Sequence, residues 1–207
     1  MLTAFESLER LKSGNERFAT NVRSLDAMLS HARRPDFTDG QNPFAIILGC
    51  SDSRVPAEVV FDQGLGDLFV IRVAGNIVAP SQVGSVEFAA ARYHSRLVVV
   101  MGHSRCGAIQ ATVESICSPE LDGDSRNIAS IVDRVRPSVL SVATPELREH
   151  PAEWIKRATR ANVRASVDHL RHGSAVLEQL IERDGLLVVG AEYSLETGRV
   201  EFFDGAL

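Results

Sequence analysis

Short apolar runs alternate with amphipathic segments along most of the chain. The apolar runs have the length of β-strands buried on both faces, and they span residues 44–48, 68–73, 97–101 and 186–189. Segments with helical spacing lie between or after them, at residues 81–93, 107–116, 128–140 and in the long stretch 145–183. This alternation predicts an α/β domain with a largely parallel β-sheet flanked by helices.

The two ends of the chain extend this pattern. Apolar residues near helical spacing predict an amphipathic helix over the first twenty residues, and Pro35, Gly40 and Pro43 predict an irregular arm or loop at 30–43. A final run at 199–203 follows a Glu-Thr-Gly turn, and we expect it to pair antiparallel with the strand before it. The length fits one domain, residues 1–207, with a helix and arm at about 1–42 and an α/β core at about 43–207.

Charge and hydropathy argue against two classes of partner. The chain has 22 Lys and Arg against 27 Asp and Glu, so its net charge of −5 offers no basic excess for nucleic acid. No apolar run approaches the roughly 18 residues that a membrane span needs, and the N-terminal residues lack the regions of a signal peptide. We therefore expect a cytoplasmic protein that binds neither nucleic acid nor membrane. Its three cysteines are too few for a disulfide framework, which leaves thiols for metal binding or catalysis.

Metal-binding residue types follow two of the predicted strands. Cys50 follows the first strand, and His103 and Cys106 follow the third. In open α/β sheets, sites form beyond the carboxyl ends of strands where the strand order reverses, so the three side chains converge if these strands are neighbours. Two thiolates and one imidazole suit Zn²⁺. Three protein ligands leave a tetrahedral ion one open position, which is typical of catalytic zinc.

The third cysteine, Cys117, is the remaining candidate for a fourth ligand. It lies 11 residues beyond Cys106 (117 − 106), which is roughly 16 Å along a helix. That distance is too great for a shared ion. We expect Cys117 to be a small buried residue instead.

An acidic and a basic residue stand just beyond the first predicted ligand. If this segment is extended, alternate residues share a side, so Asp52 lies within reach of the metal and Arg54 within reach of Asp52. A carboxylate held ionised by arginine can accept a hydrogen bond from a metal-bound hydroxide and orient its lone pair. Zinc lowers the pKa of its bound water to about 7, which provides that nucleophile at neutral pH.

Three motifs resemble the signatures of the β-class carbonic anhydrases in order and spacing. They are Cys-Ser-Asp-Ser-Arg-Val-Pro at 50–56, Arg-Val-Ala-Gly-Asn at 72–76 and Gly-His-Ser-Arg-Cys-Gly at 102–107, and the resemblance extends from about residue 8 to 203. It implies the β-carbonic anhydrase fold, with a C-terminal antiparallel edge strand. It also implies one Zn²⁺ per subunit on Cys50, His103 and Cys106, and a catalytic pair of Asp52 with Arg54. The family's assembly implies an obligate homodimer, or a tetramer, with the active site at the dimer interface.

The resemblance includes a substrate pocket. Gln41 matches a glutamine that binds substrate oxygen in plant-type members, which implies that it reaches across from the partner subunit. Phe69 and Phe88 match the aromatic wall of the CO₂ pocket, although plain core packing is an alternative for both. In some relatives the aspartate leaves its arginine and binds zinc, so Asp52 is a candidate fourth ligand in a closed state.

The expected function is the zinc-dependent, reversible hydration of CO₂ to bicarbonate and a proton, by attack of a zinc-bound hydroxide. Two alternatives stay open. A hydrolase of CS₂ or COS could use the same scaffold and the same nucleophile. A non-catalytic, zinc-stabilised oligomeric module would instead have a closed four-ligand site and would tolerate Asp52→Asn.

Overall fold

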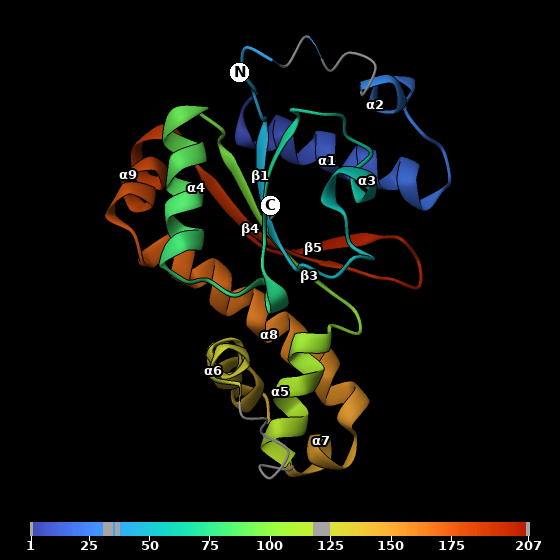
Figure 1. The fold of residues 1–207 in the computed structure, drawn as a ribbon, viewed down its shortest axis with the longest axis vertical. Coiled ribbons are helices and arrows are strands. Elements are labelled where there is room, and N and C mark those ends of the chain that lie inside the picture. Colours follow the sequence, from blue (N-terminus) through green and yellow to red (C-terminus); the bar gives the residue numbers. More distant parts are fainter. Residues whose placement is uncertain (1, 31–34, 36–37, 118–124, 206–207) are drawn as a thin grey trace.

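The structure is a computed structural model that describes residues 2–30, 35, 38–117 and 125–205. These residues form a five-stranded sheet in the order β2-β1-β3-β4-β5 (Figure 1). The strands are β1 (Ala45–Gly49), β2 (Leu68–Arg72), β3 (Leu97–His103), β4 (Leu187–Tyr193) and β5 (Val200–Asp204). All neighbours are parallel except β4 and β5, which are antiparallel. The predicted fold class, with its antiparallel edge strand, is confirmed.

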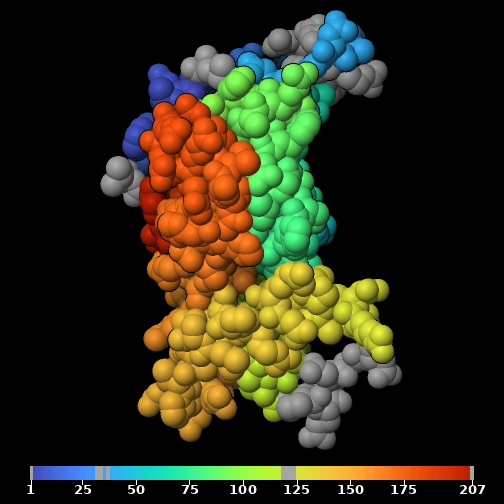
Figure 2. Space-filling view, turned by 90° about the vertical axis from the view of Figure 1, so that its left-hand side faces the viewer, coloured from blue at the N-terminus to red at the C-terminus, as the bar shows by residue number. Residues whose placement is uncertain are grey.

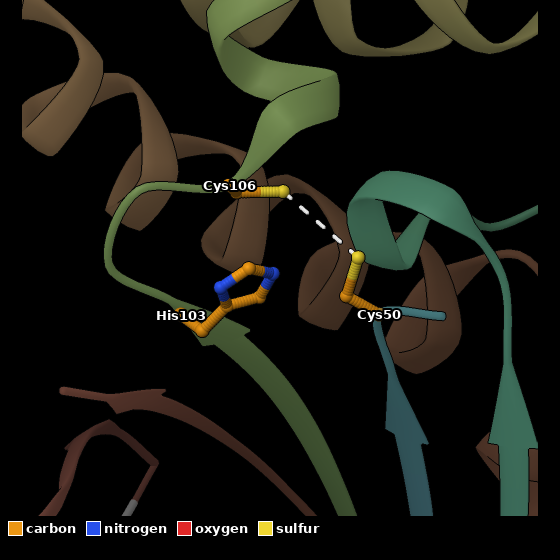
Figure 3. Close-up of side chains that lie close together, drawn as sticks. All are labelled: Cys50, His103 and Cys106. Carbon is orange, nitrogen blue, oxygen red and sulfur yellow. Dashed lines mark hydrogen bonds between the residues drawn. The ribbon is translucent and has the colours of Figure 1, made fainter. Parts of the chain in front are cut away.

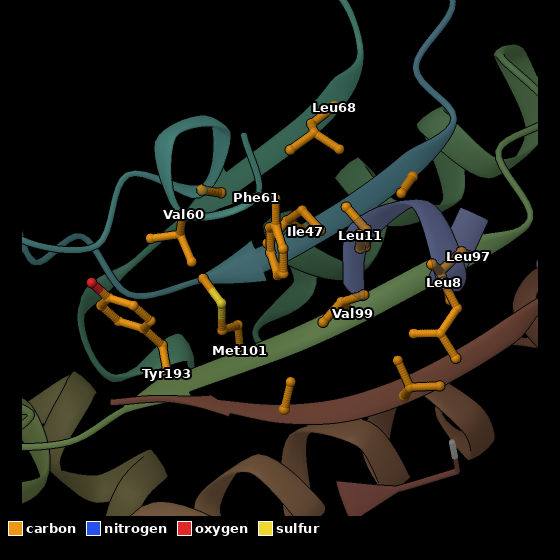
Figure 4. Packing of buried hydrophobic residues seen from close by; sticks show 14 of the residues in the cluster. Leu8, Leu11, Ile47, Val60, Phe61, Leu68, Leu97, Val99, Met101 and Tyr193 are labelled. Atoms are coloured by element: carbon orange, nitrogen blue, oxygen red, sulfur yellow. The ribbon is translucent and has the colours of Figure 1, made fainter. Parts of the chain in front are cut away.

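The two central strands are buried on both faces because their alternate side chains enter different core clusters. Ile47 and Val99 pack with Leu8, Leu11 and Phe61 on one face (Figure 4). The other face is covered by α4 (Pro80–Arg92), α8 (Pro151–His172) and α9 (Ala175–Asp184). Figure 2 shows these three helices side by side. Burial on both faces is the reason for the continuous apolar runs in the sequence.

The N-terminal helix α1 (Ala4–Ala19) is confirmed, and its start is fixed by a capping box. Thr3 Oγ1 accepts a hydrogen bond from the Glu6 amide, and the Glu6 carboxylate accepts one from the Thr3 amide at 2.7 Å. The arm beyond it contains α2 (Leu25–Leu29), which buries none of its residues. Short elements α3 (Ala57–Val60) and the 3-10 helix η2 (Ala74–Asn76) follow β1 and β2.

A separate group of helices extends from the carboxyl ends of the strands. It consists of α5 (Gly107–Cys117), α6 (Arg126–Ser141), α7 (Pro145–Glu149) and the first turns of α8, packed around the buried Trp154. The stretch predicted to be helical at 145–183 consists of three helices. Pro145 and Pro151 each begin a helix, where the missing N–H is tolerated, and Ser174 caps α9 by accepting a hydrogen bond from the Leu177 amide. In the described ranges, no helix combines the length and the apolar composition needed to cross a membrane.

The strand order places the ends of β1 and β3 side by side. Gly49, the last residue of β1, pairs with Met101 of β3. β1 lies between β2 and β3, so the strand order reverses there, and a site is expected beyond the strand ends. Helix α8 crosses this end closely: a Cβ on Gly102 would lie 2.7 Å from Val163 Cγ2. Because Gly102 has no side chain, α8 can pack directly against the backbone just before His103.

Candidate metal centre and active site

Three donor side chains meet at the ends of β1 and β3 (Figure 3). The ligand atoms of Cys50, His103 and Cys106 all lie within 4.8 Å of one another, and the two sulfurs are 4.0 Å apart. Two thiolates bound to one tetrahedral Zn²⁺ at about 2.3 Å would lie about 3.8 Å apart. The three side chains are at most 5% exposed. The structure thus brings together all three ligands predicted from the sequence, in a spacing that fits one zinc ion.

The imidazole of His103 is oriented for metal binding. Its Nδ1–H donates a hydrogen bond to the Ser104 carbonyl at 2.9 Å, which fixes the tautomer that leaves a lone pair on Nε2. Nε2 is buried and has no hydrogen-bond partner among the described residues. A ring nitrogen faces the space between the two sulfurs in Figure 3. An unpaired buried nitrogen is costly, and a bound cation would satisfy it.

Ionisation of Cys50 disfavours ionisation of Cys106. Their mutual hydrogen bond lowers the pKa of Cys50, because it stabilises that thiolate, and raises the pKa of Cys106, because a second negative charge beside the first is unfavourable. A divalent cation removes this conflict because it binds both sulfurs as thiolates. The chemistry of the donor set therefore fits a metal such as zinc.

A strained turn connects His103 to Cys106. Arg105 has a left-handed backbone with φ of 55°, which costs a residue other than glycine about 1–3 kcal/mol. The Ser104 amide donates to the Tyr193 carbonyl at 2.9 Å, and α5 begins directly after Cys106. This turn brings Cys106 back beside His103.

Asp52 and Arg54 form a tight pair next to these ligands. Asp52 Oδ1 accepts hydrogen bonds from the Arg54 amide at 3.0 Å and from Arg54 Nε at 2.9 Å, and Asp52 Oδ2 accepts one from Arg54 Nη2 at 2.6 Å. Asp52 Oδ2 lies 4.0 Å from His103 Nε2. The side-chain hydrogen bonds from Arg54 hold the pKa of Asp52 well below its usual range, so the carboxylate is ionised at neutral pH.

The geometry behind this pair differs from the prediction. The segment was expected to be extended, but it forms a turn in which the Val55 amide donates to the Asp52 carbonyl at 3.0 Å. The Asp52 side chain caps the same turn by accepting a hydrogen bond from the Arg54 amide. Aspartate favours turns of this kind because its side chain can bond nearby backbone groups, which competes with an extended backbone. The extended backbone that the spacing argument assumed is therefore not formed, although the two side chains do meet as expected.

Arg72 supports the same segment and was not foreseen. Its Nε donates to the Cys50 carbonyl at 3.1 Å and its Nη2 to the Asp52 carbonyl at 2.6 Å. It lies at the end of β2, beside the end of β1. Its motif was recognised in the sequence, but only the strand register shows what its guanidinium contacts.

The predicted pocket residues lie together, but away from the three predicted ligands of their own chain. Gln41 Nε2 donates to Tyr93 Oη at 3.0 Å, and the rings of Phe69 and Phe88 lie 6.0 and 5.7 Å from the Tyr93 ring. Phe69 pairs with Ile46 of β1, four residues before Cys50 and therefore about 13 Å from it along the strand. We call Gln41, Phe69, Phe88 and Tyr93 the aromatic cluster.

Cys117 is exposed, so its expected burial is wrong. It is the last residue of α5. Its spacing matches the buried Ile109 and Val113, but at the helix end the neighbouring Ile116 packs against the core instead. Cys117 is not part of the group of donor atoms around His103.

Comparison with known proteins agrees with the motifs. A family model described as carbonic anhydrase matches residues 45–200. Carbonic anhydrase 2 of Mycobacterium tuberculosis is 37% identical over 194 residues, which cover 94% of this chain and 90% of that protein.

Solved structures share the fold. The β-carbonic anhydrase CafA of Aspergillus fumigatus has a TM-score of 0.71 at 22% identity, covering 94% of this chain and 89% of that one. A tetrameric β-carbonic anhydrase of Sordaria macrospora has a TM-score of 0.69 at 22% identity, covering 95% and 96%. The protein therefore belongs to the carbonic anhydrase family and has the fold of the β-carbonic anhydrases.

Proposed function

We propose that this protein catalyses the reversible hydration of CO₂ to bicarbonate and a proton, with one Zn²⁺ per subunit on Cys50, His103 and Cys106. The observation that carries the proposal is the buried, unpartnered Nε2 of His103 beside two thiols 4.0 Å apart. The group holds three donors among the described residues, which would leave a tetrahedral ion one position for solvent. A non-catalytic zinc module would need a fourth protein ligand, and this argues against it.

The residues around the ion have separable roles in this proposal. Zn²⁺, when bound, lowers the pKa of a water molecule to about 7 and so supplies hydroxide at neutral pH. Asp52 accepts a hydrogen bond from the O–H of this nucleophile and turns its lone pair toward CO₂. Arg54 keeps Asp52 ionised, and its three hydrogen bonds fix the position of the carboxylate. In the closed state, which stays a prediction, Asp52 would leave Arg54 and occupy that position itself.

We propose that the aromatic cluster of each subunit completes the active site of the partner in a homodimer. Phe69 and Phe88 would form an apolar wall for CO₂, and the Gln41 amide would donate to the bicarbonate oxygen. Their distance from the ligands of the same chain supports a site shared between subunits. Further support comes from exposed apolar side chains, namely Phe88, Leu25, Met28 and Leu29, which are 53, 72, 53 and 56% exposed. The tetrameric Sordaria relative supports assembly of such dimers into a tetramer.

Mixing two inactive variants is expected to restore activity if the site is shared. Cys50→Ala removes a metal ligand, whereas Gln41→Ala combined with Phe69→Ala removes the pocket. In a mixed dimer, one site combines the intact ligands of the second variant with the intact pocket of the first. Random reassortment of equal amounts should restore about a quarter of the wild-type sites. CO₂ hydration measured before and after subunit exchange checks this, and no recovery in verified mixed dimers would contradict a shared site.

Stopped-flow CO₂ hydration, followed with a pH indicator, tests the proposed activity. Zinc-loaded protein should accelerate hydration, and protein stripped by a chelator should not, because the nucleophile depends on the metal. Parallel assays with CS₂ and COS address the alternative hydrolase, which would be favoured if either of these were turned over and CO₂ were not.

We further propose that the chain is a single catalytic domain, with an N-terminal helix and arm at about 1–42 and a core at about 43–207. A cytoplasmic location also stays a proposal. It is supported by the presence of three free cysteines, because a reducing compartment keeps thiols available for metal binding.

A further inference from the structure

Glu196, in the turn between β4 and β5, contacts both residues that separate His103 from Cys106. Glu196 Oε2 accepts a hydrogen bond from Ser104 Oγ at 2.8 Å, and Glu196 Oε1 accepts one from Arg105 Nε at 2.7 Å. The same turn makes a further contact, since the Leu195 amide donates to Ser104 Oγ at 3.0 Å. One carboxylate thus bridges the whole interval between two proposed metal ligands.

The two residues that Glu196 holds also determine how the proposed ligands are oriented. The Ser104 carbonyl accepts the Nδ1–H of His103 and so fixes the plane and tautomer of the imidazole. Arg105 adopts the left-handed backbone that returns the chain to Cys106, and its carbonyl accepts a hydrogen bond from Arg54 Nη2 at 3.4 Å. A strained conformation persists only where the surrounding contacts hold it.

We propose that Glu196 is a positioning residue for the metal centre. Its carboxylate holds Ser104 and Arg105 so that His103 and Cys106 keep the spacing needed to share one ion. The inference rests on the proposed zinc site, and it concerns metal retention rather than the reaction with CO₂.

A general effect on folding is a weak explanation for these contacts. The side chains of Glu196 and Arg105 are 44% and 74% exposed, and ion pairs this exposed contribute little to stability because solvent screens them. Glu196 also lines an open groove of about 940 Å³, so its truncation creates no cavity in the core. Any large effect of substituting Glu196 on zinc binding should therefore come from a changed geometry of the turn at 103–106.

The chain offers a matched control in Glu16. Its carboxylate accepts hydrogen bonds from Arg199 at 2.5 and 3.1 Å, and the two side chains are 57% and 58% exposed. Arg199 belongs to the same β4–β5 connection, but within the part of the chain that the structure describes neither Glu16 nor Arg199 forms a hydrogen bond or ion pair with Ser104 or Arg105. Glu16→Ala removes a comparable ion pair without removing any contact to the turn at 103–106.

Zinc release to a chelator tests the proposal. Glu196→Ala should release zinc about 10-fold faster than wild type, the lower end of the range for losing an outer hydrogen-bond partner of a ligand. Glu196→Gln should lie between the two, because glutamine has one acceptor oxygen where the carboxylate uses two, one for Ser104 and one for Arg105. Glu16→Ala should match wild type. The absorption spectrum of the cobalt-substituted Glu196→Ala protein should show altered ligand geometry, which a purely stabilising ion pair would not change.

Two results would overturn the proposal. One is wild-type zinc release from folded Glu196→Ala protein, and the other is equally fast release from Glu16→Ala. These measurements use no CO₂, so they separate the two proposals. A protein that binds zinc but does not hydrate CO₂ would sink only the proposed function, whereas an active protein indifferent to Glu196 would sink only this one.

Discussion

Cys50→Ala is expected to abolish stoichiometric zinc binding and, with it, CO₂ hydration. The substitution leaves one thiol and one imidazole, too few for a stable catalytic zinc site. Zinc affinity should fall by more than the about 10- to 100-fold typical for losing an outer partner of a ligand. Metal analysis of protein purified in the presence of zinc, together with stopped-flow hydration, measures both effects.

Cys117→Ala is the matched control for this experiment. Cys117 is a free cysteine, like Cys50, but it is exposed at the end of α5 and lies outside the donor group. Its substitution should leave zinc content and turnover unchanged. Full zinc occupancy in Cys50→Ala, or loss of zinc in Cys117→Ala, would contradict the assigned ligand set.

The sheet could be predicted because its signal is local and continuous. Strands buried on both faces need apolar residues at successive positions, and the observed strands begin and end within a few residues of the apolar runs. Helix boundaries within 145–183 were missed. Their signals, Pro151 and Ser174, are single residues inside a long amphipathic pattern.

The convergence of the three donors could also be predicted, because it follows from the order of the strands in the sheet. Cys50 and His103 lie at the ends of strands that proved to be neighbours, so the topology alone brings them together. The contact between Asp52 and Arg54 was predicted correctly, but from an extended backbone. The structure has a turn capped by Asp52 instead. Family resemblance supplied Gln41, Phe69 and Phe88. The shared site that we propose for them needs a partner subunit, which one chain does not contain.

Contacts across long sequence separations could not be predicted. Glu196 was recognised only as part of a turn, because its contacts with Ser104 and Arg105 span 92 and 91 residues. The left-handed backbone of Arg105 carries no sequence signal, since arginine has no preference for it. Arg72 contacts carbonyl groups, which every residue has, so its role becomes visible only from the register of β1 and β2.

Asp52→Asn is expected to retain zinc and lose turnover. The amide keeps the shape of the side chain, and Asp52 bonds to Arg54 rather than to the three donors, so the metal site should persist. An amide has no negative charge and can present an N–H to the nucleophile, which would misorient its lone pair. We expect kcat to fall by about 100-fold or more, the scale of losing one preorganised electrostatic contact to a transition state. Metal analysis measures the zinc content of the variant, and stopped-flow hydration measures its kcat.

Asp67→Asn separates this effect from the loss of any aspartate–arginine pair. Asp67 binds Arg10 at 2.9 Å with partly exposed side chains, and its substitution should leave kcat unchanged. The outcome for Asp52→Asn also decides between the enzyme and the zinc-stabilised module. Unchanged zinc content with lost turnover requires a residue that acts on the reacting molecule and not on the ion. The zinc-stabilised module would instead tolerate the substitution, with unchanged zinc content and no CO₂ hydration in either protein, whereas zinc and turnover lost together would make Asp52 a ligand.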